Sequence, residues 1–515
     1  MSAADSRPEP TVSHPSSRRG PTGLGETSAE GAATKVGSVE QTTQSAGQGS
    51  VPGSAGSRPG RRLFGKDGLR GVANVEPVTA PVILKLGRAM AYVLRREADA
   101  SRRLKVVVGT DTRLSGFMME SALCAGLTSM GVDVLLTGTM PTPGIAYITR
   151  SLRADAGVSI TASQRPFEEN GLTFFNREGY KLAPATERRI EESVLSGEID
   201  QIRPTRDRIG RVEHVRDAVG RYVDFAKRVF PKGLTLEGVR IVVDTANGAA
   251  FETTPGILRE LGADVIVCNG QPDGYNINRE CGTAYPATMQ KAVIDHRTDL
   301  GIANDGDGDR LILCDENAQV LDGDRILAMV GLDFLRRGRL KENVLVANAM
   351  SNHGLDEAIS RAGGRVVRCQ VGSRYLLDRM VELDANLGGE PCGHVVFRDF
   401  GTTGDGIITA LQVLRIMVQT GRSLSQLARC MEPLPQARID IPVTRKPSLD
   451  QVPELAAVIS ETKREIEKDG GYLLARYSEN EPILRLLIEG KEDALLGKLA
   501  HRIQMCAEDI LSRPM

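Results

Sequence analysis

Tryptophan is absent from this 515-residue chain, and only 4% of its residues are aromatic. So few rings cannot form the stacking platform on which single-stranded nucleic acids bind. The formal net charge is −1, so no general basic field favours nucleic acid. No apolar run approaches the length that spans a bilayer. We therefore expect neither a nucleic-acid partner nor a membrane partner.

Cysteine and histidine spacings typical of metal sites are also missing. None of the eight cysteines forms a C-x-x-C pair, and the six histidines are scattered. Several cysteines lie in apolar runs, which fits reduced thiols better than a disulfide framework or a zinc site. The N-terminus lacks the apolar core of a signal peptide. We therefore expect a cytoplasmic protein.

Large apolar residues are rare in residues 1–60, which are mostly Ser, Gly, Thr, Ala and Pro. Such a segment cannot bury enough surface to offset its chain entropy, so we expect a disordered tail. A transit peptide is the alternative, which four acidic residues disfavour, namely Asp5, Glu9, Glu26 and Glu30.

A unit of strands and helices recurs three times after the tail. We expect its first strand at 105–109, 239–244 and 344–347, its second at 131–136, 262–267 and 364–367, and its third at 156–160, 300–303 and 385–388. Alternating strands and helices predict an α/β fold with mixed, mostly parallel sheets. After about residue 433 the pattern changes to that of a smaller α+β domain. The expected domains are 61–205, 206–315, 316–432 and 433–515.

The third strand of each unit runs into a loop of unusual composition. These loops comprise residues 161–166, 305–310 and 389–394. Ligands of open α/β sheets bind beyond the carboxyl ends of the strands. We therefore expect the three loops to meet in one central cleft.

The second of these loops alternates three aspartates with glycine, at Asp305, Asp307 and Asp309. Like charges so close together between buried strands favour a divalent cation with hard oxygen ligands, Mg²⁺ or Ca²⁺. An EF-hand is excluded because Arg310 stands where its loop needs glycine and because the flanks read as strands. A solvated acidic turn is the remaining alternative. The guanidinium of Arg310 would suit a phosphate next to the metal.

The C-terminal domain carries a polar turn over residues 476–482, between two apolar strands. Its arginine, hydroxyl and amide groups are those of a phosphate-binding loop. An ordinary polar hairpin explains the same composition, and the turn alone does not separate the two.

Taken together, these motifs resemble the α-D-phosphohexomutase superfamily over about residues 62–515, most closely its bacterial members that act on glucosamine phosphate. The motifs that carry the resemblance are Phe64 to Gly71, Thr161 to Gly171, Asp305 to Arg310, Gly389 to His394, Thr402 to Gly406, and Arg476 to Arg485. The resemblance implies four domains around a cleft, a phosphosugar as ligand, and a monomer or homodimer. The implied reaction moves phosphate between O6 and O1 of glucosamine through a bisphosphate intermediate.

The resemblance also implies residue roles. Ser163 would carry the phosphate and complete a Mg²⁺ site with Asp305, Asp307 and Asp309. The implied catalytic residues are Ser163, Arg70, Arg310 and His394, with Lys66 added on the argument of the next paragraph. The implied substrate-binding residues are Glu390, Cys392, Arg374, Arg476, Ser478, Asn480 and Arg485.

Several loop residues depart from the family pattern. Gln164 and Arg165 replace His-Asn after the serine, and Thr173 replaces a lysine that is a candidate acid/base. Cys392 replaces serine in the sugar loop, and Ser373 replaces an aspartate. In the phosphate-binding turn, Glu479-Asn480 replaces Gly-Thr.

Lys66 stands where the first loop of the family has threonine. We therefore expect it to take over the task of the missing lysine, with Arg70 and Arg310 lowering its pKa by like-charge repulsion. The alternatives for Lys66 are that it replaces lost phosphate contacts or that it is a neutral surface change. For the whole chain, the alternatives to a glucosamine phosphate mutase are a non-catalytic relative that binds a phosphosugar or a protein partner, and a mutase for another hexose phosphate.

Overall fold

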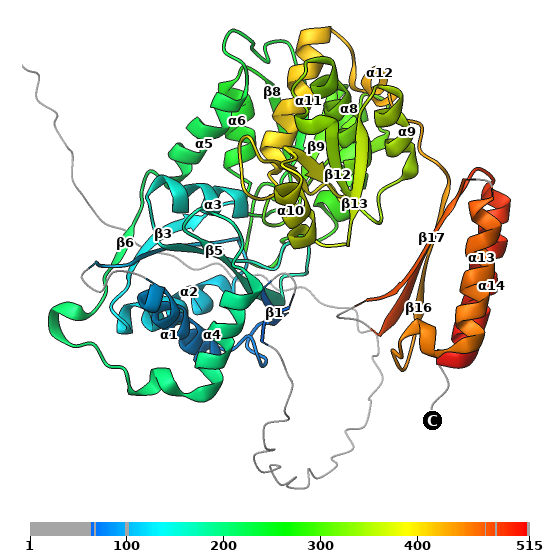
Figure 1. Ribbon diagram of the computed structural model, residues 1–515. Coiled ribbons are helices and arrows are strands. Elements are labelled where there is room, and N and C mark those ends of the chain that lie inside the picture. The colour runs from blue at the N-terminus through cyan, green and yellow to red at the C-terminus, as the bar shows by residue number, and fades with distance from the viewer. Residues whose placement is uncertain (1–62, 66–67, 98–101, 469, 479–481, 512–515) are drawn as a thin grey trace, which may run out of the picture. The chain divides into compact units, whose positions relative to one another are not determined.

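The computed structural model describes residues 63–65, 68–97, 102–468, 470–478 and 482–511 (Figure 1). Three sequence predictions concern residues outside the described ranges: the disordered tail (residues 1–60), Lys66 and Asn480. Residues 61–515 group into one compact unit. No helix in the described ranges is both long and apolar enough to cross a membrane.

The first sheet has six strands in the order β1-β5-β4-β2-β3-β6. Strands β4, β2, β3 and β6 are parallel, whereas β5 and β1 run antiparallel to their neighbours. The strands are β1 (Leu69–Val72), β2 (Lys105–Thr110), β3 (Asp133–Thr139), β4 (Ala156–Ile160), β5 (Glu169–Asn176) and β6 (Val212–His214).

Helix α1 illustrates how the sequence covers this sheet. Its apolar residues recur at helical spacing and are buried, among them Ile83, Leu86 and Met90. It packs closely on α2, because a Cβ at Gly126 would lie 2.3 Å from the backbone oxygen of Leu84. The helices of this domain are α1 (Ala80–Glu97), α2 (Gly116–Ser129), α3 (Thr142–Ser151) and α4 (Pro184–Ser196).

The second and third sheets repeat the centre of the first, which confirms the threefold unit. In each sheet the second, first and third strands of the unit are parallel neighbours, and a fourth strand runs antiparallel to the third. The second sheet contains β7 (Arg240–Asp244), β8 (Asp264–Cys268), β9 (Leu300–Asn304), β10 (Leu311–Asp315) and β11 (Val320–Leu321). The third contains β12 (Val344–Asn348), β13 (Arg365–Cys369), β14 (Leu387–Gly389) and β15 (Val395–Phe397).

One continuous apolar core joins a face of the first sheet to the second and third sheets. Helix α11 lies within it, capped by Asp405, whose carboxylate also accepts a hydrogen bond from Tyr222 of α5 at 3.0 Å. The helices here are α5 (Ala218–Val229), α6 (Thr253–Glu260), α7 (Ala287–His296), α8 (Gly323–Arg336), α9 (His353–Arg361), α10 (Ser373–Glu382), α11 (Gly406–Thr420) and α12 (Leu424–Ala428).

The C-terminal domain is an antiparallel sheet in the order β16-β18-β17, with its own apolar core. Helices α13 and α14 lie side by side along one face of this sheet (Figure 1). The elements are β16 (Gln436–Pro442), α13 (Pro453–Glu467), β17 (Tyr472–Tyr477), β18 (Ile483–Glu489) and α14 (Asp493–Leu511). Three α/β domains with mixed sheets and a terminal α+β domain are therefore confirmed.

Candidate functional site

The acidic loop is the hairpin connection between β9 and the antiparallel β10. Asp305, Asp307 and Asp309 are buried, with 0%, 3% and 8% of their surface exposed. One oxygen of each lies within 4.8 Å of one oxygen of each of the others. This convergence forms a group that could hold a metal ion, as the sequence predicted.

The electrostatics of the loop fit a cation. Burial raises the pKa of Asp305 well above its usual value, and Asp307 and Asp309 raise it further. Burial and Asp309 also raise the pKa of Asp307. One carboxylate oxygen of Asp307 accepts from Thr142 at 2.8 Å, while the other is buried and accepts no hydrogen bond from a described residue. A buried carboxylate oxygen in that state is costly unless a proton or a cation binds it.

Ser163 contacts this loop directly from the β4–β5 connection. Its hydroxyl donates to Asp305 Oδ2 over 2.8 Å, although 142 positions separate them in the chain. Its φ of 50° lies in the left-handed region, which is uncommon for serine and concentrates at functional sites. Gly306 permits the contact, because a Cβ there would lie 2.6 Å from the Ser163 carbonyl oxygen. The first two of the three predicted loops therefore meet.

Two side chains that were not predicted as site residues hold the serine loop in place. The carbonyl of Ser163 accepts from Arg113 Nη2 at 3.1 Å and from Asn278 Nδ2 at 2.8 Å. Arg113 is fully buried and pairs with Asp111. Asp111 and Arg113 come just after β2 (Lys105–Thr110). Their position at the carboxyl end of a strand is the sequence signal that could have identified Arg113 as a site residue.

Arg310 lies between the serine loop and the acidic loop. Its Nη1 donates to Gln164 Oε1 at 2.5 Å, and its Nε lies 3.9 Å from Asp305 and 3.7 Å from Asp309. Gln164 in turn donates to Thr283 at 2.7 Å. Gln164, which departs from the family pattern, therefore fixes the guanidinium of Arg310.

The third loop brings a carboxylate to the same place. Glu390 is buried, and its Oε1 accepts from Asn348 at 2.9 Å and from the backbone N–H of Gly372 at 3.1 Å. The thiol of Cys392 lies 3.6 Å from Glu390 Oε2. Burial, with Glu390 nearby, raises the pKa of Cys392 to about 12, so this thiol stays protonated near neutral pH. Burial lowers the pKa of Arg310, but the carboxylates of Asp309, Asp305 and Glu390 raise it above its usual value, which keeps the guanidinium cationic.

His394 connects the third loop to the acidic loop. It is buried, and its Nε2 lies 3.6 Å from Asp309 Oδ2 and accepts from the backbone N–H of Gly404 at 3.2 Å. Gly404 is needed here, because a Cβ would lie 2.5 Å from the imidazole ring. All three loops are thus joined by side-chain contacts.

Arg374 lies in an ion pair between domains. It makes two hydrogen bonds to Glu187 of α4, at 2.6 and 2.9 Å. Its neighbour Ser373 accepts from Lys181 at 2.8 Å. Direct contact of Arg374 with substrate stays a prediction, but the pair holds the segment whose Gly372 N–H supports Glu390.

In the C-terminal domain, Arg476 and Arg485 are direct partners across β17 and β18. Arg485 Nε also lies 3.5 Å from Asp440 of β16, so a carboxylate of the same sheet partly offsets these opposed like charges. Ser478 is buried beside them, and its carbonyl accepts from Lys446 at 2.6 Å. Lys446 is a further cation of this turn that was not predicted as a site residue. The predicted roles of Lys66 and Asn480 concern residues outside the described part.

The fold and the three joined loops together indicate the class of protein, and the comparison with family models identifies it. Family models for the phosphoglucomutase/phosphomannomutase α/β/α domains I, II and III match residues 61–200, 220–319 and 322–434, and that for the C-terminal domain matches residues 439–504. The chain belongs to this phosphohexomutase family.

Particular relatives narrow the comparison. The phosphoglucosamine mutase of Anaeromyxobacter sp. (strain Fw109-5) is 51% identical over 466 residues, which cover 90% of this chain and 97% of the relative. A phosphoglucomutase/phosphomannomutase family protein from Burkholderia thailandensis has a similar structure, with a TM-score of 0.72 at 23% identity and coverage of 87% and 97%. The N-acetylphosphoglucosamine mutase of Aspergillus fumigatus, solved in complex with GlcNAc-6P and magnesium, gives a TM-score of 0.58 at 18% identity and coverage of 88% and 96%.

Proposed function

We propose that the protein is a phosphoglucosamine mutase, which interconverts glucosamine 6-phosphate and glucosamine 1-phosphate through a phosphoserine at Ser163. The observation that carries this proposal is the hydrogen bond from Ser163 Oγ to Asp305, which places the serine at the buried acidic group. Sequence identity of 50–51% to phosphoglucosamine mutases, over 84–90% of this chain, supports the choice of substrate. The free state of all eight cysteines suits action in the cytoplasm.

In the proposed cycle, the phosphate leaves Ser163 for the free hydroxyl of the sugar phosphate. The bond from phosphorus to Ser163 Oγ breaks, a bond to the sugar oxygen forms, and a 1,6-bisphosphate results. The bisphosphate turns over, and its other phosphate returns to Ser163. Such transfers depend on positioning and charge stabilisation more than on covalent help.

The residues around Ser163 match that demand. A phosphoserine brings about −1.5 to −2 charge, and Arg310 and Arg70 supply cations next to it. Gln164 keeps the planar guanidinium of Arg310 oriented, which matters because bidentate phosphate contacts are directional. We assign to Lys66 the role of accepting the proton of the reacting sugar hydroxyl. The reason is that Thr173 lacks the amine of the family's lysine, whereas Lys66 adds an amine in the first loop.

The acidic loop is proposed to hold Mg²⁺ through Asp305, Asp307 and Asp309, with Ser163 or its phosphate as a fourth ligand. When bound, Mg²⁺ neutralises charge that develops on the transferred phosphoryl group. The oxygen of Asp307 that accepts no hydrogen bond supports this assignment. Mg²⁺ suits a small all-oxygen site that leaves room for a substrate phosphate.

Substrate recognition is proposed to use both ends of the cleft. Glu390, held by Asn348 and Gly372, would accept hydrogen bonds from sugar hydroxyls. Arg476, Ser478 and Arg485, with Asn480, would bind the phosphate that is not reacting. Recognition by phosphate alone allows the sugar to bind in either orientation, and closure of the C-terminal domain would exclude water from the phosphoserine.

A coupled mutase assay tests the proposal. Purified protein with Mg²⁺ and glucosamine 6-phosphate should form glucosamine 1-phosphate, faster when a hexose 1,6-bisphosphate is added to phosphorylate Ser163. The Ser163→Ala variant should be inactive under both conditions. Faster turnover of mannose or glucose phosphate would reassign the substrate. Binding of phosphosugar without turnover of any hexose phosphate would favour a non-catalytic relative instead.

A further inference from the structure

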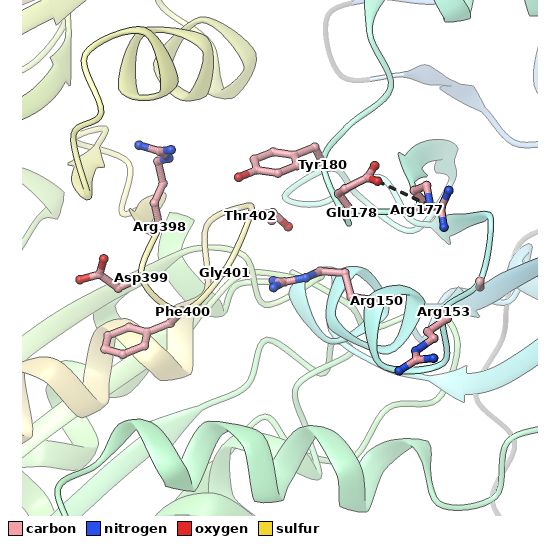
Figure 2. Close-up of a pocket in the computed structure, with 11 residues that line it drawn as sticks. Arg150, Arg153, Arg177, Glu178, Tyr180, Arg398, Asp399, Phe400, Gly401 and Thr402 are labelled. Atoms are coloured by element: carbon pink, nitrogen blue, oxygen red, sulfur yellow. Dashed lines mark ion pairs between the residues drawn. The ribbon is translucent and has the colours of Figure 1, made fainter. Parts of the chain in front are cut away.

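A hollow of about 460 Å³ lies apart from the three joined loops (Figure 2). Its walls come from the end of α3, from the turn after β5 and from the segment after β15. None of its eleven lining residues is an acidic-loop, serine-loop or sugar-loop residue. They are Arg150, Arg153, Ala154, Arg177, Glu178, Tyr180, Arg398, Asp399, Phe400, Gly401 and Thr402.

Arginine dominates the charge of this hollow, with four guanidinium groups against two carboxylates. Both carboxylates already have cationic partners, because Glu178 lies 3.6 Å from Arg177 and Asp399 lies 3.7 Å from Arg339, which is outside the hollow. The positive charge of the other three arginines is therefore not balanced within the hollow.

Arg150 and Arg153 make no side-chain hydrogen bond or ion pair with any residue in the described part of the chain. Figure 2 shows the guanidinium of Arg150 extending from α3 toward Gly401 and Thr402. Both side chains are exposed and line the hollow, so an anion within it would meet two cations that no described carboxylate neutralises.

Arg398 is fixed more firmly than the other two. Its Nη1 donates to the carbonyls of Met380 at 3.0 Å and Ala385 at 2.9 Å, and it lies 3.2 Å from Asp384. A guanidinium already oriented by backbone carbonyls loses little entropy when a ligand binds. In Figure 2 the ring of Tyr180 points toward Arg398.

The two sides of the hollow are joined by a short hydrogen bond. Thr402 donates to the carbonyl of Gly179 at 2.6 Å, so the loop after β5 and the segment after β15 contact each other directly. Gly179 is required there, because its φ is 80° and a Cβ would lie 2.8 Å from the oxygen of Ala146. The two segments that line the hollow on either side are thus held together by a defined contact.

We propose that this hollow is a binding site for a small molecule that carries two or more phosphate charges, held by Arg150, Arg153 and Arg398. Arginine forks match phosphate oxygens in geometry and charge. The volume is within the range of small-molecule sites and exceeds what a single phosphate fills. The rings of Tyr180 and Phe400 provide apolar wall for the rest of the ligand. The proposal does not depend on the mutase function.

Hydrogen exchange on the full chain, titrated with inorganic pyrophosphate as the probe, separates this site from the catalytic cleft. Pyrophosphate should slow exchange in residues 177–180 and 398–402 of the unaltered protein. The double variant Arg150→Gln, Arg153→Gln should shift the midpoint of that protection at least about tenfold. Arg188→Gln, which removes an exposed arginine of α4 outside the hollow, should leave the midpoint unchanged.

Absence of protection in the unaltered protein, or an unchanged midpoint in the double variant, would overturn the proposal. Two further titrations identify the source of the phosphates. A lower midpoint for a hexose 1,6-bisphosphate than for pyrophosphate would assign the site to the bisphosphate of the mutase reaction. A lower midpoint for a nucleoside diphosphate would assign it to nucleotides, with the base against Tyr180 or Phe400.

Discussion

The guanidinium of Arg70 donates a hydrogen bond to the hydroxyl of Thr173 over 3.1 Å. The family pattern has a lysine at that position, whose ammonium has no acceptor and could not receive this hydrogen bond. Arg70 is also close enough to Asp307 to lower the pKa that burial raises. Thr173 is thus consistent with a site in which Arg70, held by this hydrogen bond, supplies the positive charge next to Asp307.

Removing the acceptor should release Arg70. We expect Thr173→Val, which keeps the shape of the side chain, to lower kcat roughly tenfold with little change in KM. Thr173→Ser keeps the hydroxyl and should stay near the unaltered rate. Steady-state kinetics with glucosamine 6-phosphate measure both variants. Equal rates for the valine and serine variants would show that the hydrogen bond does not matter for turnover.

The position of the missing lysine also bears on Lys66. If Lys66 moves the proton of the reacting hydroxyl, Lys66→Thr should abolish turnover, and adding Thr173→Lys should restore part of it. The same coupled assay measures the single and double variants. An active enzyme whose rate is unaltered by Lys66→Thr would refute the compensation and would leave Lys66 as a neutral surface change.

The main features of the fold were predictable because they depend on short-range patterns. Alternating strands and helices indicated three repeats, and strand polarity placed three loop ends together, which the Ser163–Asp305 and His394–Asp309 contacts confirm. Gln164 and Arg310 are 146 positions apart, and the residue before Gln164, Ser163, has left-handed backbone. No local pattern contains that information. For the same reason, the pairing of Arg374 with Glu187 in another domain was not predicted.

The acidic loop gives a direct test of the metal proposal. Asp307→Asn removes a negative charge and replaces one of the two carboxylate oxygens by an amide nitrogen, so Mg²⁺ affinity should fall by at least about 100-fold. Isothermal titration calorimetry with MgCl₂ measures the change. Asp295→Asn, an exposed aspartate of α7, serves as the matched control and should bind as before. The same affinity in both variants would place the metal elsewhere.

Ser163 should accept exactly one phosphate. Intact-mass analysis after incubation with a hexose 1,6-bisphosphate should show a single added phosphate, which Ser163→Ala abolishes. Ser115→Ala is the control, because Ser115 accepts a hydrogen bond from Asn170 close to the same loop. Phosphate that still appears on the Ser163→Ala variant would assign the acceptor to another residue.

Asp324 at the start of α8 predicts how stability changes with pH. It is buried, its Oδ2 accepts from the backbone N–H of Asn352 at 2.8 Å, and burial raises its pKa from 3.8 to about 7. The folded state therefore holds this proton more tightly than the unfolded state. The resulting stability is complete below pH 4 and is lost as the pH rises through 7.

Asp324→Asn imitates the protonated acid and should remove that loss. Relative to the unaltered protein, the variant should gain up to about 4 kcal/mol in unfolding free energy at pH 8, and much less at pH 5. Melting temperatures at the two pH values measure the difference, with Asp378→Asn, an exposed aspartate of α10, as the control. A gain that is equal at pH 5 and pH 8 would mean that the substitution acts through packing rather than through the proton, because only a titrating carboxylate makes the gain depend on pH.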